Sequence, residues 1–171
     1  NLDALQSIAP QIQVVAPSVA GTVSVSMNQV DSDAAVMAKF NSDISISVKD
    51  ASAVDAQNLL TQGPANLTEI HVLDTGSQVV SQLAGLKNKS MIQSIQIQDP
   101  AIPLALTATQ WASNTTTLAK ITGNVQFAVS DATVAKLPDL LNDQRVQQIS
   151  INDTASAIAN GLSDLQTANS R

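Results

Sequence analysis

Cysteine is absent from the 171 residues, so the chain can form no disulfide, thiolate metal site or cysteine nucleophile. Aromatic residues make up 2% of the chain and charged residues 13%, whereas ordinary globular proteins carry roughly 25% charged residues. The core must therefore be built from Ala, Val, Ile and Leu, and the surface from Asn, Gln, Ser and Thr.

Basic residues are also scarce. The chain has 8 Lys and Arg against 14 Asp and Glu, and its net charge is −6. Since the basic residues do not cluster, no surface for a phosphate backbone is expected, and nucleic acid is excluded as a partner. No apolar run approaches the roughly 18 residues of a membrane span, so we expect none. The chain opens without a signal sequence and has the pattern of a fragment of a longer protein.

Aspartate is the dominant acidic residue, and Glu69 is the only glutamate. Short segments that alternate apolar and polar residues recur along the chain, and each one precedes an Asp. This alternation predicts β-strands. The five segments are Ile44–Val48 before Asp50, Ile70–Leu73 before Asp74, Ile95–Gln98 before Asp99, Val125–Val129 before Asp131, and Ile149–Asn152 before Asp153.

Apolar residues at helical spacing follow most of these segments, most clearly over Ala155–Leu165 and also over Val79–Leu86. Each Asp thus lies where a strand gives way to a helix, and its carboxylate can accept the unpaired backbone N–H groups of the first helical turn. The pattern predicts structural helix caps at four aspartates, each contributing about 1 kcal/mol. They are Asp50, Asp74, Asp131 and Asp153.

The longer gap between Asp99 and Asp131 predicts an inserted strand over Ile102–Leu106. Thr107 or Thr109 then caps a helix that carries Trp111, Leu118 and Ile121. The start of the chain has the same construction, with segments Ile12–Val15 and Thr22–Ser26 before an amphipathic stretch through Phe40. The inserted segments could join a parallel sheet or form hairpins. Pro138 predicts a helix that is broken or begins late, near Leu137.

These features recur at shifts of about 80 residues, which suggests two blocks, approximately 1–82 and 83–171. A strand and a helix within 22 to 25 residues repeat the parallel βαβ connection. The sequence therefore predicts an α/β fold: a single repeat domain over residues 1–171, in which strand–helix units form a solenoid with inserted extra strands.

Three segments resemble a known repeat: Ser150–Gln166, Ser130–Val134 and Leu104–Gln110. They are similar to the strand-Asp-Thr-Ala-helix repeats of very large secreted bacterial surface proteins. Asn1–Gln6 looks like the helix of that repeat, whereas Asp31–Phe40 and Pro138 depart from it. The resemblance implies an extracellular or cell-surface protein, often associated with hemolysin-type calcium-binding arrays and type I secretion. It implies no catalytic residues.

Two single residues are candidates for chemistry. His71 is the only histidine, so no second histidine is present to complete a metal site, and we interpret it as an exposed or hydrogen-bonded strand residue. Trp111 shares a helical stripe with Leu118 and is interpreted as a packing anchor rather than an exposed binding aromatic. No catalytic, cofactor-binding or metal-binding set of residues is predicted.

The aspartates could instead form a calcium ladder, but calcium requires roughly 6–8 oxygen ligands. The Gly-Gly-x-Gly-x-Asp calcium repeat is absent, so capping is favoured, with Asp31, Asp33 and Asp43 as the candidate exceptions. Four triplets fit the glycosylation pattern, as expected by chance in a chain this rich in Asn, Ser and Thr. They begin at Asn66, Asn88, Asn114 and Asn152.

The leading functional hypothesis is a non-catalytic structural or spacer segment of a secreted or cell-surface bacterial protein of the adhesin type, whose partners are neighbouring repeats of its own chain. The alternative is an extracellular module that binds a glycan or a host protein through an exposed face. Positions that would form this face are Gln96, Gln98, Gln126 and Ser150. An enzyme, such as a polysaccharide lyase, has the least support because no catalytic constellation is present.

Overall fold

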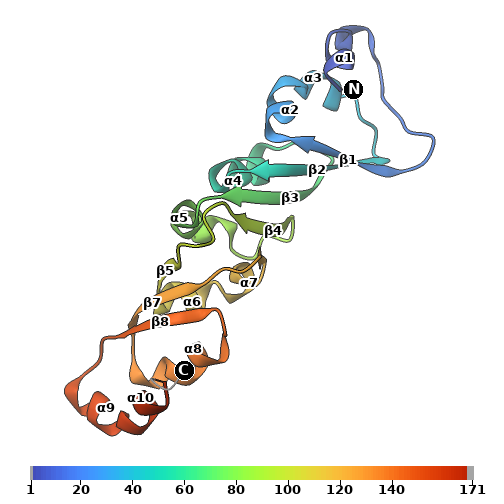
Figure 1. The fold of residues 1–171 in the computed structure, drawn as a ribbon. Coiled ribbons are helices and arrows are strands. Elements are labelled where there is room, and N and C mark those ends of the chain that lie inside the picture. The colour runs from blue at the N-terminus through green and yellow to red at the C-terminus, as the bar shows by residue number, and fades with distance from the viewer. Residues whose placement is uncertain (1, 169–171) are drawn as a thin grey trace. The chain divides into compact units, whose positions relative to one another are not determined.

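The computed structural model describes residues 2–168 and has a mixed α/β fold, with 42% helix and 29% strand arranged in parallel sheets (Figure 1). The predicted α/β class is confirmed. The chain divides into two compact units. Unit 1 comprises residues 1–74 and 88–96, and unit 2 comprises residues 75–87 and 97–171.

Unit 1 is built around four adjacent strands in the order β1-β2-β3-β4. β1 pairs with β2 in parallel, and β2 pairs with β3 in parallel. The elements are α1 (Leu2–Gln6), the 3-10 helix η1 (Ala9–Gln11), β1 (Gly21–Ser26), α2 (Met27–Ser32), α3 (Ala34–Met37), β2 (Ile44–Ala51), α4 (Ala53–Gln62), β3 (Leu67–Asp74) and β4 (Ile92–Ile97).

Unit 2 contains a three-stranded parallel sheet in the order β5-β7-β8. Its elements are α5 (Gly76–Leu86), β5 (Leu104–Thr107), α6 (Ala108–Ser113), α7 (Thr115–Leu118), β6 (Ile121–Thr122), β7 (Phe127–Ala132), the 3-10 helix η2 (Val134–Lys136), α8 (Leu137–Asn142), β8 (Val146–Ile151), α9 (Ala155–Asn160) and α10 (Leu162–Ala168).

Each unit has an aliphatic core, as the composition requires. Ile46 and Ile70 are fully buried in unit 1, as is Phe127 in unit 2, and they lie among Leu, Val and Ile side chains. The inserted strands β1 and β5 each pair in parallel with the following strand, so they extend the sheets and do not form hairpins.

The two units share one irregular strand register. Ile46 pairs with Leu67 and Ser47 with Glu69, which skips one residue of β3. In unit 2, Phe127 pairs with Val146 and Ala128 with Gln148, which skips one residue of β8. A second irregularity follows in each pair of strands, and there Asp50 and Asp131 have φ angles of 57° and 54°. These two aspartates are therefore strand residues in a left-handed conformation.

Several predicted boundaries were wrong. Within Ile12–Val15, only Val15 takes part in sheet pairing, through one isolated bridge to Phe40. The helix expected to reach Ile121 ends at Leu118, and Ile121 starts a short strand. The helix expected over residues 155–165 is interrupted at Gly161, where a Cβ atom would collide with the side chain of Val134. The late helix start at Leu137 is confirmed.

Candidate functional site

The predicted caps were wrong at four of five residues. Thr107 caps α6: its hydroxyl accepts the N–H of Gln110 at 3.1 Å, and the Gln110 side chain accepts the N–H of Thr107. The caps of the other full helices are hydroxyl residues that come after the predicted aspartates. They are Ser52 for α4, Thr75 for α5 and Thr154 for α9. A short hydroxyl at this extended position reaches the third amide of the helix, whereas the preceding Asp still belongs to the strand or its end.

Three aspartates instead cap a helix that lies earlier in the chain. Asp74 accepts the N–H of Ala53 at 2.9 Å, Asp99 accepts that of Gly76 at 2.7 Å, and Asp153 accepts that of Val134 at 3.0 Å. The donors are the first residues of α4, α5 and η2. Each carboxylate therefore links one strand–helix turn to the turn before it. The recurring spacing located these aspartates, but periodicity along the chain could not show which helix each one reaches.

A charged cluster holds the turn before β8. Arg145 binds Asp143 with both carboxylate oxygens, at 3.0 and 2.9 Å, donates to the carbonyl of Leu118 at 2.9 Å, and lies 4.7 Å from the centre of the Phe127 ring. The Arg145 guanidinium holds the pKa of Asp143 below its ordinary value against the opposing effect of burial, and Trp111 adds a smaller hydrogen-bond contribution. Trp111 is half-buried, in keeping with a packing role.

Asp33 and Asn114 occupy equivalent places between two short helices, α2 and α3 in one unit and α6 and α7 in the other. Both side chains are buried, and each has one oxygen without a hydrogen-bond partner in the described structure. Burial, followed by the nearby Asp3 carboxylate, raises the pKa of Asp33. Asp31 and Asp43 are exposed, and residues 2–168 contain no group of three side chains that could hold a metal ion.

His71 lies in β3 and is half-exposed. Its Nδ1 atom is 2.8 Å from the hydroxyl of Ser94 on β4, and its Nε2 atom is 3.8 Å from the carboxylate of Glu69. Since Glu69, His71 and Ser94 are all intermediate in exposure, they form a polar cluster at the surface of the sheet. His71 is therefore a hydrogen-bonded strand histidine, as the sequence indicated.

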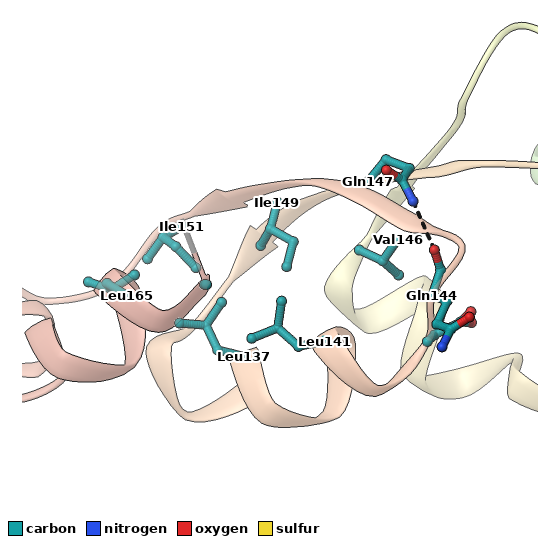
Figure 2. A pocket seen from close by; sticks show the side chains of 10 residues that line it. Leu137, Leu141, Gln144, Val146, Gln147, Ile149, Ile151 and Leu165 are labelled. Atoms are coloured by element: carbon teal, nitrogen blue, oxygen red, sulfur yellow. Dashed lines mark hydrogen bonds between the residues drawn. The ribbon is translucent and has the colours of Figure 1, made fainter. Parts of the chain in front are cut away.

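The largest hollow in unit 2 lies between β8 and α8 and has a volume of about 590 Å³. In Figure 2, Val146, Ile149 and Ile151 project from β8 toward Leu137 and Leu141 of α8. Leu165 of α10 lies beside Ile151. We call this hollow the β8–α8 groove. Apart from Leu137, the labelled apolar side chains that line it are only half-buried, so the groove is an open part of the core.

A smaller hollow of about 230 Å³ lies on the β5-β7-β8 sheet. Polar side chains line it from three strands, among them Thr107, Ser130, Gln148 and Ser150. The other glutamines assigned to a possible binding face, Gln96 in unit 1 and Gln98 and Gln126 in unit 2, are also exposed. The surface of the sheet is therefore polar and uncharged at these positions.

Comparison with known families finds no matching family model, and no curated protein matches the chain. Among residues 2–168, no helix has both the length and the apolar character needed to cross a membrane.

Proposed function

We propose that this chain is a non-catalytic spacer segment of a large secreted or cell-surface bacterial protein of the adhesin type, built as a repeat solenoid of strand–helix units with 22 to 25 residues each. A single observation carries the proposal. The carboxylate cap between successive turns and the skipped strand register occur in both units at a shift of 79 to 81 residues, as in Asp74 with Ala53 and Asp153 with Val134.

Such an arrangement suits a spacer because each turn is held mainly by its neighbours. Adding turns then changes the length of the protein without a new core. The uncharged polar face and the absence of a metal-binding cluster in residues 2–168 fit this role. The resemblance to secreted bacterial repeats supports the assignment to a secreted or cell-surface protein.

Surface display tests the spacer proposal. One, two or three tandem copies of the chain are placed between a membrane anchor and a small binding domain on bacterial cells, and the height of that domain above the membrane is measured by fluorescence quenching. The height should increase in equal steps with each added copy, as for a linker helix of matched length. A height that does not change with copy number would contradict the proposal.

The second candidate function is an extracellular binding module for a glycan or a host protein. The polar hollow formed by Thr107, Ser130, Gln148 and Ser150 favours it. A glycan array probed with the purified chain tests this alternative. Binding that is lost in a Gln148→Ala, Ser150→Ala double variant but kept in Gln93→Ala would favour the binding module over the spacer.

A further inference from the structure

The β8–α8 groove lies at an open edge of the sheet. Among the described residues, β8 is the last strand in the order β5-β7-β8, so one side of its backbone faces no further strand of that sheet. Leu162, in the following helix, is 55% exposed. An open strand edge beside an apolar hollow is a natural place for an added strand.

The structure shows how other strands in this chain receive their neighbours. The N–H of Ile46 donates to the carbonyl of Asn66, that of Ile70 to Met91, and that of Phe127 to Arg145, at 2.7 to 2.8 Å. In each case the incoming strand supplies the carbonyl. Ile149 occupies in β8 the place that Ile70 has in β3, because Ile70 pairs with Val48 and Ile149 with Val129 in the same irregular register. Its N–H therefore faces the open edge.

The incoming strands also share a spacing. Eight residues after each accepting carbonyl stands the aspartate that caps the earlier helix: Asp74 follows Asn66, Asp99 follows Met91, and Asp153 follows Arg145. Apolar residues occupy the first, fourth and sixth positions after the carbonyl in all three strands. These residues are Leu67, Ile70 and Val72, then Ile92, Ile95 and Ile97, and finally Val146, Ile149 and Ile151.

We propose that the β8–α8 groove binds one further strand of this type, contributed by the next unit of the array, and that it recognises the pattern apolar-x-x-apolar-x-apolar-x-Asp. The backbone of the incoming strand would accept the Ile149 N–H, its apolar residues would close the groove, and its Asp would accept the N–H of Ala155 at the start of α9. Gly76, the equivalent residue in α5, receives this contact from Asp99. This inference rests on the proposed repeat function.

The next unit is favoured over a second copy of this chain as the occupant. The added strand would continue the β7–β8 contact and repeat a junction that the chain already makes three times. The segment of a second copy that corresponds to β4 lies near Val15, and it has Ser18 where β4 is followed by Asp99. A second copy would therefore lack the carboxylate.

Charge is compatible with this occupant. Residues 92–98 of β4 and its following turn carry no charge, and Asp99 is their first acidic residue. The carboxylate in the groove, Asp143, is already neutralised by Arg145. The incoming backbone therefore meets no unpaired charge in the groove, and its own carboxylate meets the first amide of a helix, where negative charge is favourable.

The first experiment uses a fluorescent peptide of residues 88–100, the chain's own strand of this type, with the intact chain as receptor. Fluorescence anisotropy should show saturable binding to one site, and amide hydrogen exchange should show protection of Ile149. Ile149→Lys should weaken binding at least tenfold. Asp99→Asn in the peptide should weaken it about tenfold, the equivalent of about 1.4 kcal/mol.

Matched controls separate the groove from non-specific adhesion. Val54→Lys changes an apolar residue of α4 that is 47% exposed, and it should leave the affinity for the peptide unchanged. A peptide of the same composition in scrambled order should not bind. Protection of Ile70 in place of Ile149, or equal binding by the Asp99→Asn peptide, would overturn the proposal.

Because an isolated strand loses much freedom on binding, a second variant carries residues 88–100 after Arg171 on a Gly-Ser linker. Its unfolding midpoint should rise by a few degrees, and Asp99→Asn in the added copy should remove part of that rise. Failure of both the peptide and the tethered strand would reject the groove. The display experiment on reach would still decide the spacer proposal, and concentration-dependent self-association of the unmodified chain would favour a second copy.

Discussion

β3 and β8 differ in burial although their sequences follow the same pattern. Leu67, Ile70 and Val72 of β3 are 5%, 0% and 1% exposed, whereas their counterparts in β8 are half-exposed. Both strands pair with the preceding strand in the same register. β3 has β4 on its other side and β8 has no equivalent in the described structure. Burial in this fold therefore depends on the neighbouring strand and not on the strand's own residues.

The largest effect is expected from truncation of the same residue in the two strands. Ile70→Ala should lower the free energy of unfolding by about 3 kcal/mol, because it leaves a cavity in a closed core. Ile149→Ala should cost less than about 1 kcal/mol, because its site is partly open to solvent. Urea denaturation measures both. Equal losses would show that β8 is buried in solution.

The turn before β8 should give the next largest effect. Asp143→Asn removes a carboxylate bound twice by Arg145 and should cost about 2 kcal/mol at neutral pH. Since the pKa of Asp143 is lowered in the folded state, its contribution is present above the unfolded pKa and is lost as the pH falls through the folded value.

Urea denaturation between pH 2 and pH 7 checks this prediction, because the two proteins should converge in stability at the acidic end. Asp139→Asn is the control. Asp139 lies 3.6 Å from Lys136, but both side chains are more than half exposed, and such pairs contribute little. A loss for Asp143→Asn that does not depend on pH would contradict an ionic role.

The alternation of apolar residues located the strands because one face of each strand is buried. It correctly placed Ile44–Val48 and Ile70–Leu73 within β2 and β3. It also indicated Leu104–Leu106 in the inserted strand β5. The parallel pairing of that strand could not be chosen from the sequence, because a hairpin satisfies the same alternation.

The caps show where local reasoning failed. Asp50 was predicted to cap a helix, but it has a positive φ angle inside β2, and Ser52 caps α4. An Asp followed by Ser or Thr offers two acceptors near one helix start, and the sequence does not say which one turns inward. The contact of Asp74 with Ala53 joins residues 21 positions apart, so it depends on the packing of successive turns.

The link between turns should have an effect of intermediate size. Asp74→Ala removes the acceptor for the first amide of α4 and should lower the free energy of unfolding by about 1 kcal/mol, the usual loss for a helix cap. Asp164→Ala, an exposed residue in the first turn of α10, is the matched control and should change stability by at most a few tenths of a kcal/mol. Thermal and urea unfolding of the two variants would reveal no difference if the link contributed nothing.

The smallest effect compares the buried polar residues of the two units by exchanging them. Asp33→Asn gives unit 1 the residue of unit 2, and Asn114→Asp makes the reverse change. Because the pKa of Asp33 is raised in the folded state, its ionised form opposes folding as the pH rises above the unfolded value, near 3.8. Asp33→Asn should therefore raise the unfolding midpoint at pH 7 and lose this advantage below pH 3.8, whereas Asn114→Asp should lower the midpoint at pH 7 and recover in acid. Thermal unfolding across this pH range tests both variants, and a midpoint difference for Asp33→Asn that stayed constant with pH would show that the Asp33 carboxylate is not the source of the difference between the units.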